Sequence, residues 1–229
     1  MVTKVQLQEN ENKSVVLPYD KCEEIFVEDL GDLTPKPFYN FLKRAFDIVF
    51  SILALLILLL PMLIISIIVK STSKGKVFYL QKRLGLNGKK FNVIKFRTMC
   101  VDAEKNGAQW SEGDRDPRIT SFGRFLRKTR IDEIPQFWCI LKGDMSLIGP
   151  RPERECFYKE FEQYIHGFNQ RLKVKPGLSG LAQVRGGYYL KPEEKILYDV
   201  EYIKTRGILV DIKLTLLTFI AVLKGEGAK

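Results

Sequence analysis

The stretch AFDIVFSILALLILLLPMLIISIIV, residues 45–69, is the longest apolar run in this 229-residue chain and decides its fold. Asp47, near its start, is the one charged residue within it. A helix of about 20 apolar residues is long enough to cross the hydrocarbon core of a bilayer. The stretch therefore predicts a helix that is embedded in a membrane.

Pro61 interrupts this run near its middle, where it removes a backbone hydrogen bond and favours a bend. Basic residues flank the run on both sides: Lys43 and Arg44 before it, and Lys70, Lys74 and Lys76 after it. Because basic flanks mark the cytoplasmic side, both ends are expected on the same face. A re-entrant helix that bends at Pro61 satisfies this expectation, and a single span with a tolerated proline is the alternative.

The rest of the chain is more polar than this run, and the pattern along the whole chain predicts three parts. Residues 1–40 are an extension of uncertain order, 41–76 hold the re-entrant membrane helix, and 77–229 form a catalytic domain. Short strand-like pieces at Val77–Leu80 and Phe91–Phe96 surround turn signals at Gly85 and Asn87-Gly88, and another turn signal lies at Gly113. We therefore expect an α+β fold, a membrane helix plus a small mixed domain of helices and short strands.

The C-terminal segment Ile208–Leu223 is apolar with only Asp211 and Lys213 charged, and it is short for a membrane span. We expect an amphipathic helix that lies on the membrane surface. A buried core helix is the alternative.

The formal net charge is +10, with an acidic surplus in the first 44 residues and a basic surplus beyond them. Such a surplus attracts anionic lipid, phosphorylated substrates or nucleic acid, and charge alone does not separate these partners. The four cysteines lie far apart without a C-x-x-C pair, which indicates neither a zinc site nor a disulfide framework and suits a reducing cytosolic face.

Candidate chemistry must come from carboxylates, lysine, cysteine or hydroxyl groups, because His166 is the only histidine and has no histidine partner. The densest stretch is TRIDEIPQ, residues 129–136, where Thr129-x-x-Asp132 resembles a capping box and Pro135 suits a first helical turn. This pattern places Asp132 and Glu133 at a helix start amid arginines, and plain helix-start acidity is the alternative.

Two further segments are candidate anion sites. Arg151 lies between two prolines in GPRPER, a rigid turn that can hold a guanidinium ready for phosphate. The basic, glycine-rich loop from Lys173 to Gly187 is a weaker candidate. Asp114 and Asp116 form a D-x-D pattern that can hold a metal, but Asp116-Pro117 is more typical of a turn.

Six ordered blocks together resemble the bacterial sugar transferase family, the monotopic polyprenyl-phosphate phosphoglycosyl transferases, over about residues 40–224. The blocks are KRAFDIVFS (43–51), the proline-broken run, QKRLGLNGKKFNVIKFRTM (81–99), DPRITSFGRFLRKTRIDEIPQFW (116–138), LKGDMSLIGPRPER (141–154) and VKPGLSGLAQVRG (174–186). This resemblance implies a short form without an N-terminal multi-span domain, at the cytoplasmic face of the bacterial inner membrane.

The resemblance also implies an activity, substrates and site residues. Asp132 would attack the sugar-bearing phosphate of a UDP-sugar, release UMP and hold the phosphosugar until a polyprenyl phosphate, undecaprenyl phosphate, accepts it. Mg²⁺ would assist at Asp132, and Glu133 would be a metal-site or proton-handling partner. Phosphate and nucleotide contacts carry over to Lys95, Arg97, Arg127, Arg151, Lys175 and Gln183. The implied partners are these substrates and inner-membrane lipids, not nucleic acid, and a homo-oligomer stays open.

Two positions depart from the family pattern, Leu181 where tryptophan is usual and Arg185 where asparagine is usual, so the sugar is not fixed. Two other functions stay open. One is a membrane-anchored glycosyltransferase that moves the sugar alone and releases UDP, and the other is a basic membrane-binding protein without enzymatic activity.

Overall fold

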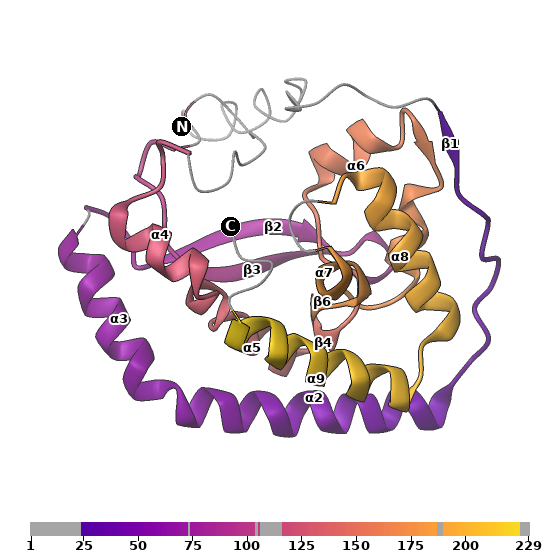
Figure 1. Ribbon diagram of the computed structural model, residues 1–229, viewed down its shortest axis with the longest axis horizontal. Helices are drawn as coiled ribbons and strands as arrows, with labels where there is room; N and C mark the ends of the chain where they lie inside the picture. The colour runs from indigo at the N-terminus through magenta and orange to yellow at the C-terminus, as the bar shows by residue number, and fades with distance from the viewer. Residues whose placement is uncertain (1–23, 73, 104, 106–115, 187–189, 225–229) are drawn as a thin grey trace, which may run out of the picture.

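A computed structural model describes residues 24–72, 74–103, 105, 116–186 and 190–224. Helices predominate, and three separate pairs of short strands accompany them (Figure 1), which confirms the predicted mixture of helix and strand. The elements are, in chain order, β1 (Ile25–Phe26), α2 (Pro37–Ile57), α3 (Leu59–Thr72), β2 (Phe78–Leu84), η2 (Leu86–Gly88), β3 (Lys90–Phe96), α4 (Ser121–Lys128), η4 (Ile131–Glu133), α5 (Gln136–Lys142), β4 (Ser146–Ile148), α6 (Glu155–Phe161), β5 (Ile165–His166), η5 (Phe168–Lys173), β6 (Gly177–Ser179), α7 (Leu181–Arg185), α8 (Pro192–Thr205) and α9 (Ile208–Lys224).

The predicted membrane helix is a bent pair, α2 and α3, with a bend of 61°. The helix is interrupted at Leu58, one turn before Pro61, which lies in the first turn of α3. Proline has no N–H for the carbonyl of Ile57 and its ring clashes there, so the break falls on the N-terminal side of the proline. None of the described helices alone is long and apolar enough to cross a bilayer, and α2 and α3 meet that criterion only as a bent pair.

The bent pair frames the rest of the molecule (Figure 1), and α9 lies alongside α2, with the rings of Phe219 and Phe50 6.1 Å apart. Leu214 is the one buried side chain of α9 among those the structure describes, so α9 is not the core helix that the sequence left open. Three helices therefore expose an apolar surface, made by Phe38, Phe41, Phe46, Val49, Ile52, Leu53, Leu56 and Ile57 of α2, Leu59, Leu60, Leu63, Ile64 and Ile67 of α3, and Leu209, Ile212, Leu216, Phe219, Ile220 and Val222 of α9.

The hairpin β2–β3 forms where the sequence predicts strands, with Phe78 paired to Phe96 and Leu84 to Lys90. Asn87 and Gly88 both have positive φ, 53° and 74°, the backbone conformation that an Asn-Gly turn favours. The predicted turn and both predicted strands are thus confirmed, although each strand extends beyond the predicted bounds.

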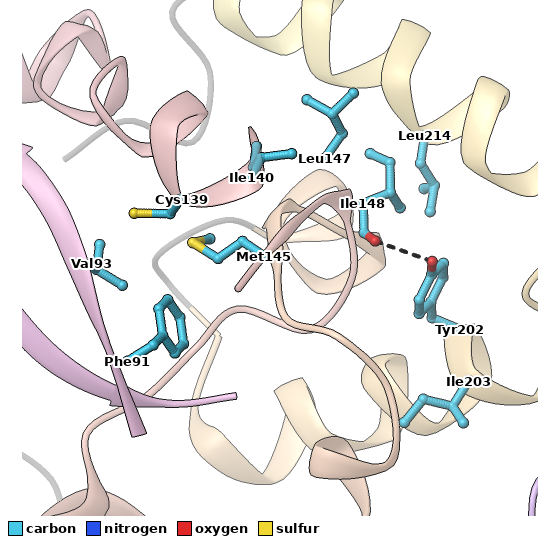
Figure 2. Packing of buried hydrophobic residues seen from close by; sticks show 10 residues of the cluster. All are labelled: Phe91, Val93, Cys139, Ile140, Met145, Leu147, Ile148, Tyr202, Ile203 and Leu214. Atoms are coloured by element: carbon cyan, nitrogen blue, oxygen red, sulfur yellow. Dashed lines mark hydrogen bonds between the residues drawn. The ribbon is translucent and has the colours of Figure 1, made fainter. Parts of the chain in front are cut away.

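The core that positions the site gathers side chains from elements far apart in sequence. It packs one face of β3 against α5, β4, α8 and α9, and the hydroxyl of Tyr202 donates to the carbonyl of Ile148 (Figure 2). Burial of each large apolar side chain contributes about 1.5–3 kcal/mol. The buried members are Phe91, Val93, Cys139, Ile140, Met145, Leu147, Ile148, Tyr202, Ile203 and Leu214.

Most of the predicted extension, Cys22 included, lies outside the described residues, and its described part packs on the catalytic domain. There β1 pairs in parallel with β5, with Ile25 opposite Ile165. Leu30 and Leu33 pack against the core described above. The segment from residue 24 to α2 is therefore an integral part of this fold.

Candidate active site

Asp132 and Glu133 lie in η4, the single 3₁₀ turn that joins α4 to α5. Arg130, just before this turn, has a left-handed backbone with φ 57°. The predicted capping box is wrong, because the hydroxyl of Thr129 donates back to the carbonyls of Phe125 and Leu126. Thr129 thus caps carbonyls at the end of α4, and the sharp turn after it presents the two carboxylates.

Glu133 is a fixed anion. Its Oε1 accepts from Lys95 Nζ at 2.7 Å and from Arg151 Nη2, and its side chain is only 7% exposed. Burial alone would raise the pKa of Glu133, but the two cations, Arg151 foremost, hold this pKa well below its usual range. Glu133 therefore stays ionised and anchors both cations in place.

Asp132 has a different environment although it is the adjacent residue. Within the described ranges, no hydrogen bond or ion pair holds its carboxylate. Burial raises the pKa of Asp132 to about 6, and the neighbouring charge of Glu133 adds to this rise while Lys95 opposes it. Two adjacent carboxylates with pKa values pushed apart are typical of groups with separate catalytic roles.

A cavity of about 790 Å³ opens in front of Asp132. It collects six of the residues singled out from the sequence: Lys95, Arg97, Arg127, Asp132, Arg151 and Gln183. Lys175 does not line this cavity and instead lines a separate one beside α2. The structure therefore brings all the predicted phosphate-binding residues except Lys175 to the carboxylate pair.

Neighbouring groups hold several of these cations in position. Arg127 Nε donates to the Thr98 hydroxyl at 2.9 Å, and Arg97 Nη2 donates to the carbonyl of Val69 at 3.3 Å, at the end of α3. Such contacts reduce the freedom of a long side chain, so less conformational entropy is lost when it binds an anion.

Arg151 is supported through its backbone. Arg171 Nη2 donates to the Arg151 carbonyl at 2.8 Å, and Arg171 Nε forms a fully buried ion pair with Asp199 at 2.7 Å. Arg171 and Asp199 also line the cavity. The two prolines predicted a rigid GPRP turn, and in the structure this buried ion pair also holds the turn in place.

Sequence reasoning missed other basic residues of the cavity wall. Three of them, from β2, η5 and α8, have no local motif that marks them as members of one site: Arg83, Arg171 and Lys195. Burial, together with Arg171 and Arg151, lowers the pKa of Lys195, against the opposing effect of Glu153.

The other candidates lie apart from the carboxylate pair or outside the described residues. Asp116 is buried, pairs with Arg118 at 2.6 Å and accepts from the Arg118 backbone N–H, which is turn chemistry. Asp114 lies outside the described residues, so the D-x-D pattern stays untested. His166 stacks on Phe26 at 4.6 Å, away from the cavity.

No cluster of three or more histidine, cysteine or acidic side chains suited to a metal occurs in the described parts of the chain. Mg²⁺, however, is commonly held by one or two carboxylates together with substrate phosphates and water. Asp132 lines the cavity, and its carboxylate oxygens accept no hydrogen bond from the described part of the chain. The residues present therefore fit a Mg²⁺ ion that the substrate helps to bind.

A buried carboxylate in a cavity walled by arginines and lysines defines the class of the site: it is suited to enzymatic chemistry on phosphorylated substrates. The bacterial sugar transferase family model matches residues 38–225. The chain therefore belongs to this family, which confirms the resemblance drawn from its sequence.

Individual curated proteins are also similar to this chain. The chain is 41% identical over 212 residues to the UDP-N-acetylgalactosamine-undecaprenyl-phosphate N-acetylgalactosaminephosphotransferase of Aeromonas hydrophila, covering 91% of this chain and 50% of that protein. It is 38% identical over 205 residues to the UDP-glucose:undecaprenyl-phosphate glucose-1-phosphate transferase of Escherichia coli, covering 84% and 44%. The UDP-galactose-lipid carrier transferase of Erwinia amylovora is 36% identical over 226 residues, covering 93% and 46%. The chain thus spans about half the length of these relatives.

Proposed function

We propose that this chain transfers a sugar-1-phosphate from a UDP-sugar to undecaprenyl phosphate and releases UMP, as a membrane step of envelope glycan assembly. Family membership supports this reaction class, and the relatives' names supply both substrates. One observation carries the proposal: of two adjacent carboxylates, Glu133 is held by Lys95 and Arg151, while Asp132 faces the cationic cavity without a hydrogen bond to any residue that the structure describes.

Asp132 is the nucleophile in this proposal. A carboxylate oxygen attacks the phosphorus that carries the sugar, a new O–P bond forms, and the bond from that phosphorus to the bridging oxygen breaks. UMP leaves with the bridging oxygen and its electron pair. A phosphate oxygen of the lipid then attacks the same phosphorus, forms the lipid diphosphate sugar and frees the carboxylate.

The surrounding cations bind and orient the anions. Arg127, held by Thr98, and Arg97 lie where they can contact phosphate oxygens, and Arg151 combines such a contact with its hold on Glu133. Lys95 lowers the pKa of Asp132 and so favours its ionised, nucleophilic form. Mg²⁺, held by Asp132 and substrate phosphates, would neutralise charge on the diphosphate.

The bent pair supports a placement in the membrane. We propose that α2 and α3 enter and leave the membrane on the cytoplasmic face, with α9 lying in the interface. The exposed apolar side chains of all three helices support this arrangement, as do the basic residues at both ends of the pair. A long-tailed lipid phosphate and a water-soluble nucleotide sugar meet only at such an interface.

The released nucleotide tests the reaction. The protein in detergent or nanodiscs, with Mg²⁺, undecaprenyl phosphate and a panel of UDP-sugars, should release UMP with one or more of them. Release of UDP would instead favour transfer of the sugar alone. Absence of turnover across the panel, with salt-sensitive binding to anionic vesicles, would favour the non-enzymatic alternative.

The covalent intermediate needs its own test. Incubation with the active UDP-sugar and Mg²⁺, without lipid acceptor, should leave a phosphosugar on Asp132, detected by mass spectrometry of the peptide that contains it. Asp132→Asn should abolish both adduct and turnover, whereas Glu133→Gln should impair turnover and can still permit adduct. An adduct on Glu133, or UMP release only when the acceptor is present, would contradict the proposed pathway.

The sugar stays open, since the three relatives named above are described with N-acetylgalactosamine, glucose and galactose. The two departures from the family pattern, Leu181 and Arg185, bound α7, and Gln183 of the same helix lines the cavity. We therefore expect sugar preference to respond to exchanges on α7, measured with the same panel.

A further inference from the structure

A second cavity, of about 400 Å³, lies beside the first turns of α2 and is distinct from the one in front of Asp132. The segment before α2, the loop that holds Lys175 and the end of α8 complete its walls. Six basic residues and one carboxylate, Asp47, line it: Lys36, Lys43, Arg44, Lys173, Lys175 and Arg206. We call this the α2 pocket.

Four of the six basic residues have no carboxylate within ion-pair distance in the described parts of the chain. Lys36 donates to the Arg206 carbonyl, and Arg206 itself donates to two backbone carbonyls. Arg44 likewise donates to two carbonyls, at the end of α5. Backbone carbonyls satisfy hydrogen bonds but carry no net charge, so these contacts do not neutralise the cations.

The two other cations are paired, Lys43 with Asp211 at 2.7 Å and Lys173 with Asp29 at 3.3 Å. The Asp47 carboxylate accepts from two neutral groups, the Ser146 hydroxyl and the Leu147 N–H, so its charge can offset only one of the other four cations. The pocket therefore keeps a positive surplus.

Lys175 is the basic residue of the α2 pocket whose surroundings most favour the binding of an anion. It makes no hydrogen bond with any described residue, although its side chain is half-buried. A Cβ placed on Gly143 would lie 3.7 Å from Lys175 Nζ and 3.4 Å from Arg44 Nη2, so two like charges are neighbours there. Burial, followed by the charge of Arg44, lowers the pKa of Lys175. Two adjacent cations of this kind are stabilised when an anion binds between them.

The position of the pocket relative to the proposed membrane surface also suits a lipid headgroup. At 100° per residue, its α2 residues Asn40, Lys43 and Asp47 share one face of the helix, while the exposed Phe38 and Leu56 lie on the opposite face. An α-helix with its side chains is about 10 Å thick. When the apolar face meets the acyl chains, the pocket therefore lies near the phosphates of the same leaflet.

We propose that the α2 pocket binds the phosphate group of an anionic membrane phospholipid, with Lys175 and Arg44 as its direct contacts. This inference rests on the membrane placement proposed above, but not on the transfer reaction. An anionic lipid suits the pocket better than a zwitterionic one, because a choline group would add positive charge where it is already in excess. Bound lipid would fix the N-terminal end of α2 at the membrane surface.

Amine acylation tests the pocket at the level of single residues. The full chain is incorporated into vesicles of phosphatidylcholine, with or without phosphatidylglycerol, and acylation of each lysine is followed by mass spectrometry. Inorganic phosphate added to the phosphatidylcholine vesicles forms the third arm. Lys213 of α9 is the matched control, since it is exposed beside the same apolar surface but outside the pocket.

Phosphatidylglycerol should slow acylation of Lys175 by about fivefold or more relative to phosphatidylcholine alone, with a much smaller change at Lys213. In native mass spectrometry, Lys175→Ala should retain fewer phosphatidylglycerol molecules than the wild type, and Lys213→Ala should retain as many. Equal slowing at both lysines would overturn the pocket in favour of general attraction to the membrane. Equal protection by inorganic phosphate would overturn the lipid as its source.

Co-flotation distinguishes a failure of this inference from a failure of the proposed membrane placement or of the proposed transfer reaction. Failure of the wild type to float with any vesicle would refute the membrane placement. Flotation with Lys175 unprotected would refute only the α2 pocket, whatever the result of the UMP assay.

Discussion

Asp132→Asn should stabilise the protein at neutral pH while it abolishes activity. The Asp132 carboxylate is nearly buried and has no hydrogen bond among the described residues, and burial raises its pKa from 3.8 to about 6. The ionised form is therefore less favourable in the folded protein than in the unfolded chain. Asparagine keeps the shape and removes this charge.

The magnitude follows from the size of the shift. About 2 pH units correspond to about 3 kcal/mol at 1.36 kcal/mol per unit, an upper bound because a buried amide also needs hydrogen-bond partners. Between its two pKa values, the folded protein binds the Asp132 proton more tightly than the unfolded chain does. The free energy of unfolding thus falls as pH rises through about 4 to 6, and the whole cost is present at about pH 7.

Chemical denaturation in detergent and EDTA, at about pH 7.5 and at about pH 4, measures this effect without interference from metal. The asparagine variant should be more stable than the wild type at the higher pH, and the difference should nearly vanish at the lower. Asp102→Asn is the control, because the Asp102 side chain is 64% exposed. A variant less stable than the wild type at neutral pH, or an equal gain at both pH values, would refute the reasoning.

Four other outcomes are expected. Arg151→Lys should lower UMP release at least about tenfold, because a point charge cannot replace a planar fork that also holds the Glu133 carboxylate, and activity kept within about threefold would contradict this role. Lys95→Met removes a cation that lowers the pKa of Asp132, so the acid limb of the pH–rate profile should move to higher pH, and an unmoved limb would exclude that effect. Cysteines in place of Asn40 and Lys74 should be labelled from the same membrane face, since labelling from opposite faces would mean a full span. Chelation of divalent cations should stop UMP release and added Mg²⁺ should restore it, whereas turnover that persists in chelator would remove the metal from the proposal.

Local patterns predicted the parts of the fold that local chemistry determines. Alternating strands around Asn87-Gly88 gave the hairpin, and Pro61 gave the bend to within one turn, because each depends on backbone preferences of a few residues. The pairing of β4 with β6 was not predicted. It depends on glycines that let two distant backbones meet: a Cβ on Gly177 would lie 2.1 Å from the Gly149 nitrogen.

The close approach of Gly149 and Gly177 also explains why Lys175 lies in a different cavity from the one expected. The glycine-rich loop was interpreted as a phosphate cradle, but Gly149 and Gly177 are required for backbone packing between β4 and β6. This pairing fixes the side to which the loop presents its residues, and Lys175 lines the α2 pocket as a result. Tertiary packing, which a single sequence does not encode locally, thus decided which cavity this residue enters.

Asp47 shows how the predicted membrane helix and the candidate active site are joined. A charge inside an apolar run is costly in lipid, yet this carboxylate is only 3% exposed and accepts from the Leu147 N–H at 2.9 Å. Arg44, almost one turn earlier, donates to the carbonyls of Ile140 and Leu141. These two side chains bond α2 directly to β4 and α5, the elements that precede Arg151 and follow the carboxylate pair. The position of Asp132 relative to the apolar surface is therefore fixed by hydrogen bonds within the fold, so in the proposed reaction Asp132 would keep one depth while the two substrates approach it from water and from lipid.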